Sequence, residues 1–419
     1  MTENPTDAFA SSRDANPETA RFFWNGGPFE IAERTWFASE FSGVTAFETD
    51  EGIVLVDSGT TFLAPKLAAE IRQVTQAPIH TAIFTHGHVD HAYGLQEFLA
   101  PGQAPPRVIA HAAMPERFAR YEATAGHNEA INARQFGGAV DSGQTVSFAP
   151  PSILPDTLYD DELTIVVGGV TFELHHALGE TDDHTWVWCP DREVLCPGDL
   201  VIWAVPNCGN PQKVQRYPWA WAEALRAMAA EEARTLAPGH GGAIVDDPEK
   251  VRHLLTETAD FLQVIVDRTL AALNDESPPH VDIVQAVDLP VSESPWLQPV
   301  YDEGEFIVRN VIRYFGGWYT GRPSELKPAA RAGVAAEIVA LAGGPEALLD
   351  RAETLAAEGD PRLASHLADY ALEAVPDVPA VAERVAALYD ERATGESSLM
   401  AANLFRSAAA YARAGRPYA

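Results

Sequence analysis

The sequence is poor in cysteine and in positive charge. Only Cys189, Cys196 and Cys208 occur among 419 residues, and an odd number of cysteines in a long chain suggests no disulfide framework and fits a reducing compartment. Lys and Arg number 29 against 60 Asp and Glu, which gives a formal net charge of −31. Such a chain repels nucleic-acid phosphates and anionic lipid surfaces, so we expect neither as a partner.

Long apolar runs are also missing. The most apolar strand-like run, at 165–170, is interrupted by Gly168 and Gly169, and no stretch approaches the roughly 18 to 20 apolar residues that cross a bilayer. The amino terminus, from residue 1 to about 21, is polar and acidic, without the basic start and apolar run of a secretory signal. We therefore expect no membrane partner and a cytoplasmic location.

The chain does contain 46% hydrophobic residues, as globular proteins do. Short β-rich runs alternate with amphipathic helical segments in its first two thirds. This order predicts an α/β fold with two sheets flanked by helices. The expected strands are 35–39, 44–48, 53–56, 81–84, 107–110, 163–167, 170–175, 185–188, 194–197 and 235–237, and the expected helices are 63–74, 115–123, 128–135, 220–230 and 248–273.

Changes in composition along the chain predict four parts. A polar N-terminal segment, 1–28, precedes an α/β domain at 29–273. A stretch rich in Pro, Ser and Asp predicts a linker at 274–296, and the Ala, Leu and Glu that predominate afterwards predict a helical domain at 297–419.

Three imidazoles and one carboxylate lie within six positions, directly after the apolar run 82–84: His86, His88, Asp90 and His91. A turn at the end of a strand can direct several side chains to one point, and His and Asp are suitable ligands for zinc-like ions. His86 and His88 can point to one side of the turn while Asp90 and His91 serve a second ion nearby. The spacing therefore suggests a site for two metal ions.

This pattern resembles the signature of the metallo-β-lactamase superfamily, whose fold is an αββα sandwich with a two-metal site. The resemblance implies further ligands from three later loops. Asp199, after Pro197-Gly198, corresponds to the carboxylate that bridges the two ions, and His240 is the last ligand of the second ion. Asp90 and Asp199 are the residues that we expect to be catalytic.

The loop at 178–184 carries the third ligand of the first ion. Glu180 stands where the superfamily usually has a histidine, a change that resembles the alkylsulfatase branch. His184 in the same loop is the alternative ligand. Asp57 and His176 are expected to support ligands rather than to bind metal, although Asp57 is also compatible with an ordinary turn.

The later part of the chain carries a second resemblance. The runs at 296–301, 308–310 and 313–319 are similar to the start of the helical dimerisation domain of alkylsulfatases, which implies a homodimer. The resemblance extends over about residues 35 to 415. It implies a binuclear metal-dependent hydrolase that cleaves an alkyl sulfate ester, a small molecule, with metal-bound hydroxide as the nucleophile. The expected cofactors are two zinc ions, with manganese or iron as alternatives.

The segment that should hold the sulfate departs from the alkylsulfatase pattern. That branch has an Asn followed by a Thr-x-Arg segment; here the stretch 206–216 retains Asn207, but the arginine position does not align cleanly. Lys213 and Arg216 are the candidate cations, or else solvated loop residues. They are not equivalent, because Arg offers a bidentate fork that Lys lacks.

Two residues and two other functions stay open. His127 and Asn128 fall in the segment that approaches the substrate in this branch, and the surface of a helix is their alternative placement. The same two-metal site also suits another ester, a lactone, an amide, a thioester or a phosphoester, because a fold does not determine the substrate. A di-iron redox protein is the alternative outside hydrolysis.

Overall fold

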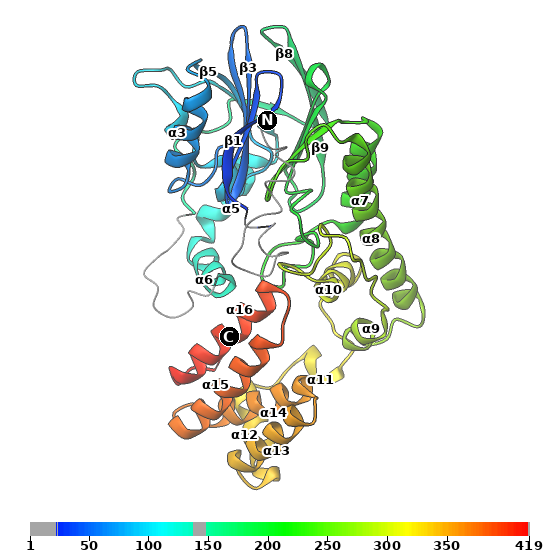
Figure 1. Cartoon of the computed structure of the whole chain (residues 1–419). Coiled ribbons are helices and arrows are strands. Elements are labelled where there is room, and N and C mark those ends of the chain that lie inside the picture. Colours follow the sequence, from blue (N-terminus) through cyan, green and yellow to red (C-terminus); the bar gives the residue numbers. More distant parts are fainter. Residues whose placement is uncertain (1–21, 23, 137–147, 418–419) are drawn as a thin grey trace. The chain divides into compact units, whose positions relative to one another are not determined.

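The computed structural model describes Phe22 and residues 24–136 and 148–417, so most of the predicted polar segment 1–28 lies outside the described residues. The chain folds as two compact units (Figure 1). The first contains the described residues up to Thr124 together with Phe148–Gly317, and the second contains those from Ala125 to 136 together with the chain from Trp318 onward.

A seven-stranded sheet begins the first unit, and its strands follow one another in chain order. The first four pair antiparallel, and from β4 onward the neighbours are parallel. The carboxyl ends of β4 and β5 therefore lie side by side at one edge of the sheet. The strands are β1 (Gly26–Ala32), β2 (Thr35–Glu40), β3 (Ser42–Thr49), β4 (Gly52–Val56), β5 (Ile79–Ile83), β6 (Arg107–His111) and β7 (Thr157–Tyr159).

A five-stranded sheet in the order β12-β11-β10-β9-β8 packs on the first. Its strands are β8 (Glu162–Val167), β9 (Val170–Ala177), β10 (His184–Cys189), β11 (Val194–Gly198) and β12 (Thr235–Pro238). The inner faces share one apolar cluster, in which the rings of Phe47 and Phe172 meet edge to face at 5.2 Å. Alternate residues of both sheets thus form the central core.

Helices cover the outer face of each sheet (Figure 1). On the first sheet lie α3 (Ala64–Val74) and α5 (Met114–Ala123), and on the second lie α7 (Pro218–Ala230) and α8 (Pro248–Asn274). The four layers confirm the predicted αββα sandwich. The expected strands and helices agree with the structure to within a few residues, whereas β1 and β7 were not predicted.

The predicted linker and domain boundary differ from the structure. The stretch 274–296 contains a helix, α9 (His280–Ala286), and α10 (Gly304–Phe315) follows. Ile283, Ile307 and Ile312 belong to the same apolar cluster as α7 and α8. The first compact unit therefore continues to Gly317, beyond the predicted boundary at 297, because the apolar face of α10 is buried there.

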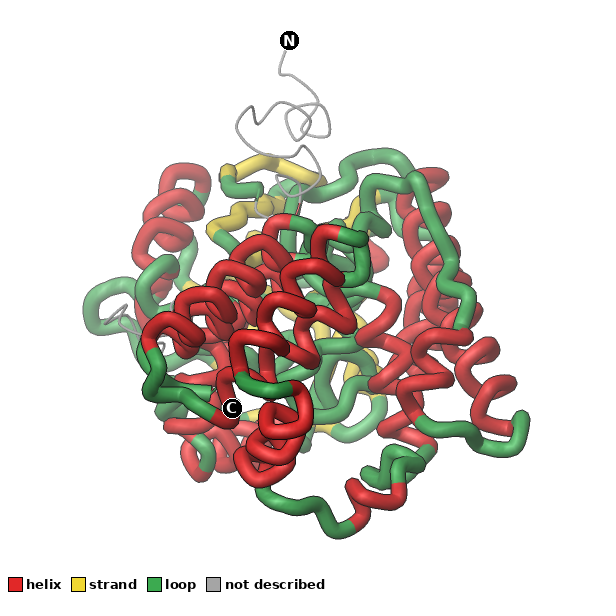
Figure 2. The backbone as a smooth tube through the Cα atoms, turned by 90° about the horizontal axis from the view of Figure 1, so that it is seen from below, coloured by secondary structure: helices red, strands yellow, loops and turns green. Residues whose placement is uncertain are grey.

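The second unit consists of helices joined by short loops, coloured red and green in Figure 2. Helices α15 and α16 pack as neighbours, as do α13 and α14. Leu349, Val385 and Ala409 are fully buried in its core. Its helices are α6 (Ala125–Gln135), α11 (Pro323–Leu326), α12 (Arg331–Ala342), α13 (Pro345–Ala357), α14 (Pro361–Ala374), α15 (Pro379–Thr394) and α16 (Leu399–Arg413).

Across the described residues, no single helix has the length and apolarity needed to cross a membrane. The bent pair α12 and α13 reaches both only when its two helices are counted together.

Candidate metal centre

The predicted ligands lie where strands of the two sheets begin or end. His86 and His88 follow β5, and α4 (Val89–Ala92) contributes the next two ligands. Asp199 follows β11, His240 follows β12, and Glu180 lies in the loop before β10. Neighbouring strand ends therefore bring together residues that are more than 150 positions apart.

The donor atoms form two clusters, in each of which all lie within 4.8 Å of one another. One contains His86, His88, Glu180 and Asp199, and the other contains Asp90, His91 and His240. Asp199 joins them, because its Oδ1 lies 3.1 Å from His91 Nε2 and its Oδ2 lies 3.3 Å from His240 Nε2. The structure thus groups all seven predicted ligands, with Asp199 between the two sets; that they bind metal stays a prediction.

The polar atoms of these clusters fit divalent ions. Glu180 Oε2 is buried and has no hydrogen-bond partner among the described residues, and the equally buried His91 Nε2 and Asp199 Oδ1 face each other at 3.1 Å. A buried polar atom costs about 1–3 kcal/mol unless something pairs with it. His86 Nε2 and His88 Nδ1 also face each other at 2.8 Å. Imidazole nitrogens and carboxylate oxygens together are the donor set of zinc and related ions.

The histidines of the first cluster are neutral. Burial holds the pKa of His86 and of His88 well below the ordinary value. The neighbouring His91 adds to this effect at His86, and the charge of Arg117 adds to it at His88. A neutral imidazole keeps a lone pair for a metal ion, so the electrostatics favour metal binding here.

The two carboxylates that belong to the first cluster differ in their charge. Burial raises the pKa of Glu180 to about 8, against the opposing charge of Arg216. Burial also disfavours the charged form of Asp199, but His240 and His91 hold its pKa well below the usual value. Asp199 is therefore the carboxylate that stays ionised, which suits a position between two cations.

Asp57 anchors the ligand loop, Thr85–His91. Its carboxylate accepts hydrogen bonds from the backbone N and from Oγ1 of Thr85, both at 2.8 Å, and its Oδ2 lies 2.8 Å from His91 Nδ1. Its backbone φ is 61°, a left-handed conformation that Asp and Asn adopt more readily than other non-glycine residues. The bond to Nδ1 presents the Nε2 of His91 to the metal centre.

Asp183 and Arg117 were not predicted, although they hold the same loop from its other side. Asp183 Oδ2 accepts a hydrogen bond from the Gly87 backbone N at 2.9 Å, and its Oδ1 accepts one from Arg117 Nε at 2.7 Å. Both side chains are buried. The position of Asp183 next to the loop of Glu180 was the one local signal, whereas nothing in the sequence around Arg117 points to this contact.

His184 and His176 lie outside both donor clusters. The ring of His184 stacks on that of His86 at 4.7 Å between centroids. His176 Nε2 lies 3.0 Å from the backbone O of Asp182, so it contacts the loop that carries Glu180. These contacts are compatible with supporting roles.

Two of the predicted substrate residues contact Glu180. Asn207 Nδ2 donates to Glu180 Oε1 at 2.6 Å, and Arg216 Nη1 lies 2.6 Å from the same oxygen. Arg216 is buried, not a solvated loop cation. Burial, together with the charge of Arg216, lowers the pKa of Lys213 to about 7.

His127 and Asn128 lie on α6, in the second unit. The side chain of His127 is exposed and that of Asn128 is buried. A contact of either residue with substrate stays a prediction.

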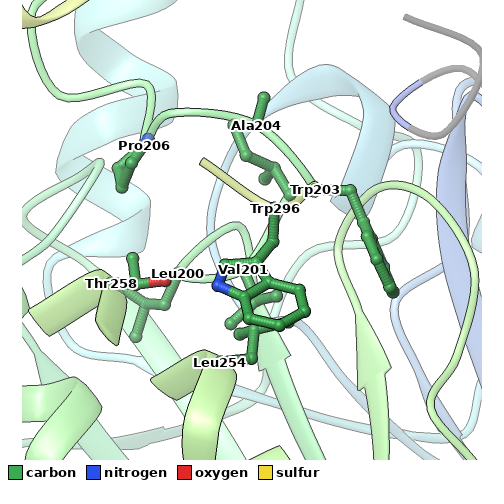
Figure 3. A pocket seen from close by; sticks show the side chains of 9 residues that line it. Leu200, Val201, Trp203, Ala204, Pro206, Leu254, Thr258 and Trp296 are labelled. Atoms are coloured by element: carbon green, nitrogen blue, oxygen red, sulfur yellow. The ribbon is translucent and has the colours of Figure 1, made fainter. Parts of the chain in front are cut away.

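A small cavity lies behind the segment that follows Asp199 (Figure 3). Its volume is about 10 Å³, which is at the limit of one water molecule. It is therefore too small for a substrate. The lining residues are Leu200, Val201, Ile202, Trp203, Ala204, Pro206, Leu254, Thr258 and Trp296.

Comparison with known families and proteins agrees with this arrangement. Residues 41–240 match the family model described as Metallo-beta-lactamase superfamily, and residues 280–415 match the one described as Alkyl sulfatase dimerisation. The first match contains all seven clustered residues, and the second begins at α9.

Two curated relatives are alkylsulfatases by name. The chain is 26% identical over 346 residues to a linear primary-alkylsulfatase of a Pseudomonas species. This match covers 78% of this chain and 65% of that protein. It is 25% identical over 358 residues to the alkyl/aryl-sulfatase BDS1 of Saccharomyces cerevisiae. This second match covers 78% of this chain and 54% of the yeast protein. The chain thus spans between about half and two thirds of the length of these relatives.

A solved structure has the same fold. The stereoselective inverting sec-alkylsulfatase Pisa1 from a Pseudomonas species superposes with a TM-score of 0.84 at 22% identity. The superposition covers 99% of this chain and 70% of that one. At this level of identity the similarity establishes the fold, and it includes the helical region.

Proposed function

Because this chain belongs to the metallo-β-lactamase superfamily and continues into an alkyl sulfatase dimerisation region, we propose that it is a binuclear metal-dependent hydrolase of alkyl sulfate esters. The observation that carries the proposal is the pair of donor clusters joined by Asp199. Zinc is the proposed ion, with manganese or iron as alternatives.

The chain's own residues would divide the work. His86, His88 and Glu180 would hold one ion, Asp90, His91 and His240 the other, and Asp199 both. Bound ions of this kind lower the pKa of water and stabilise charge on a leaving group. Asp57 would keep the Nε2 of His91 directed at its ion, and Asp183 would hold the middle of the ligand loop in place.

Local positive charge supports an anionic substrate in spite of the net charge of −31. Asn207 and Arg216 border the first cluster through Glu180. Burial and the charge of Arg216 lower the pKa of Lys213, whereas the charges of Glu180 and Asp90 raise it. An arriving sulfate would favour the charged form of Lys213, so that the cation strengthens as the substrate binds.

The test is a substrate panel offered to the zinc-loaded protein. Short primary and secondary alkyl sulfates, lactones and phosphodiesters are supplied, and sulfate release is measured by ion chromatography. We expect release from alkyl sulfates well above a metal-stripped control. Turnover of lactones or phosphodiesters alone would move the function to another hydrolysis on the same site, and tightly held iron with visible absorption would favour redox chemistry.

We further propose that two copies of the chain associate, since residues 280–415 match the dimerisation model. Light scattering should then give about twice the 45.3 kDa of one chain. A mass of one chain at micromolar concentration would contradict this.

A further inference from the structure

The loop at 205–217 reaches the first donor cluster from both of its ends. Near its start Asn207 donates to Glu180 Oε1, and near its end Arg216 lies 2.6 Å from the same oxygen. Two donors on one oxygen fix the rotation of the carboxylate, so the direction of Oε2 is fixed as well. That second oxygen is buried without a hydrogen-bond partner among the described residues.

Asn310, on α10, joins the two ends of this loop. Its Nδ2 donates to the backbone O of Cys208 at 2.7 Å and to the backbone O of Arg216 at 2.8 Å. Its Oδ1 accepts a hydrogen bond from Gln215 Nε2 at 3.0 Å. The side chain is buried, and an amide nitrogen has two hydrogens to donate. One amide therefore spans the loop from residue 208 to residue 216.

The rest of the loop is held against the same helix and the segment before it. Asp302 Oδ2 accepts a hydrogen bond from the backbone N of Gly209 at 2.6 Å. A Cβ on Gly209 would lie 2.4 Å from the backbone N of Ile307, so only glycine allows this approach. Val205 N donates to the backbone O of Gln298 at 3.0 Å. Contacts with residues 298–310 thus determine the course of the loop.

We propose that Asn310 is a positioning residue of the metal centre, which acts on the Glu180 carboxylate through Asn207 and Arg216. The proposal rests on the proposed function in that Glu180 must hold an ion. Loss of the Asn310 amide would remove the donor to the buried carbonyl of Cys208, leave Gln215 Nε2 as the remaining donor to that of Arg216, and let the ends of the loop separate. The Glu180 carboxylate would then be free to rotate. Helix α10 lies in the region matched by the dimerisation model, and it supports the metal centre whatever its part in dimerisation.

The Asn310→Asp variant tests the role of Asn310 with little change in the shape of the side chain. It replaces the donor Nδ2 with an oxygen, which would then face the carbonyl oxygens of Cys208 and Arg216. Wild type and variant are titrated with zinc in competition with a chromophoric chelator, which gives the affinity of each ion. We expect one ion to bind about 10- to 100-fold more weakly, the usual loss when a group that orients a ligand is changed. The ion at Asp90, His91 and His240 should bind as in the wild type.

Arg309→Gln is the matched control on the same helix, because Arg309 is exposed and its ion pair with Glu305, at 3.4 Å, lies on the surface. We expect both of its zinc affinities to equal those of the wild type. A merely structural Asn310 would lower the melting temperature and leave both affinities unchanged, which would overturn the proposal. Should Asn310→Asp not fold, Gln215→Ala removes the two bonds that Gln215 Nε2 donates to Asn310, to its Oδ1 and to its backbone O, and should weaken binding of the same ion to a smaller degree.

A double-mutant cycle identifies the route. If Asn310 acts through Arg216, the losses of zinc affinity in Asn310→Asp and Arg216→Lys will be less than multiplicative in the double variant. Multiplicative losses would overturn the proposed route. A wild-type protein that binds two zinc ions but releases no sulfate would contradict the proposed function alone, because the titration needs no substrate. A wild-type protein that binds no zinc would overturn both proposals.

Discussion

Two loops border the candidate metal centre, and different parts of the chain hold them. The ligand loop, Thr85–His91, is held by Asp57 at the end of the neighbouring strand and by Asp183 from the facing sheet. The 205–217 loop is held by Asn310, whose contacts span 94 and 102 positions of the sequence. The imidazole ligands therefore depend on the two sheets, whereas the carboxylate ligand Glu180 depends on a helix beyond them.

This difference between the two loops suggests which substitutions would weaken the binding of which ion. Loss of the Asp57 contact with His91 Nδ1 should affect mainly the ion held by His91. Damage to the 205–217 loop should affect the ion held by Glu180. Asp199 contacts both sets, so its loss should remove the distinction.

The largest effect is expected for Asp199→Ala. Removal of the joining carboxylate should lower kcat by at least about 1,000-fold, because several kcal/mol of transition-state stabilisation depend on both ions. Sulfate release and zinc content measure the effect together. The control is Asp275→Asn, an exposed carboxylate at the end of α8. Activity within about 10-fold of the wild type would show that the centre lies elsewhere.

Asp57→Asn tests the ligand loop alone. Asn tolerates the left-handed backbone at this position, but its amide would face the donors of Thr85 and His91. We expect the affinity of the ion at His91 to fall by about 100-fold, with a smaller change at the other ion. Chelator competition measures both affinities, and Asp50→Asn, exposed in the turn between β3 and β4, is the control. An equal loss of affinity for the two ions would contradict the idea that the two loops support different ions.

Arg216→Lys tests the other loop. Arg216 Nη1 lies 2.6 Å from Glu180 Oε1 and donates to the backbone O of Glu180 at 3.0 Å. Lysine keeps the charge but replaces the rigid planar guanidinium with a single ammonium on a flexible stem, which holds this position less well. We expect kcat/KM for a short alkyl sulfate to fall by about 10-fold, the equivalent of roughly 1.4 kcal/mol. Arg268→Lys, in an exposed pair with Asp288, should have no effect. A loss as large as that of Asp199→Ala would indicate that Arg216 takes part in the chemistry.

Asp302→Asn should have the smallest effect on activity and a visible one on the pH dependence of stability. Burial raises the pKa of Asp302 to about 7, although backbone donors from Gly209 and Glu303 favour its charged form. A raised carboxyl pKa stabilises the fold below its unfolded value, near 4, and this stabilisation is lost as the pH rises through 7. The free energy of unfolding of the wild type should thus fall relative to the variant between about pH 4 and 7, by at most about 4 kcal/mol. Urea unfolding at several pH values measures this, and parallel curves would contradict it.

The fold was largely predictable because its patterns are local. Alternation of apolar residues located most strands, and the long amphipathic stretch from Pro248 located α8. The predictions failed where local patterns are weak. Strand β7 has three residues, and α9 lies in a stretch rich in Pro, Ser and Asp, where the burial of Ile283 and Val284 outweighs composition.

The residues of the candidate site also divide into those that a local pattern predicted and those that it did not. His86, His88, Asp90 and His91 crowd into one turn, so the sequence by itself was enough to predict a metal loop. Asp199, His240 and Glu180 were predicted from a resemblance, and the structure places their donor atoms beside that turn. Asp183 has only its position close to Glu180 as a local signal and Arg117 has none, because the packing of β10 and α5 against the ligand loop is what makes them neighbours of Gly87.

The sequence by itself determined the layers of the sandwich and the chemistry of the donor groups, since hydrophobic period and side-chain type are properties of short segments. Only the tertiary structure decided that α10 belongs to the first unit and that Asn310 holds the 205–217 loop beside Glu180. The physical reason is that a buried amide has specific partners only after folding, when carbonyl groups about a hundred residues away have lost their water and must be paired.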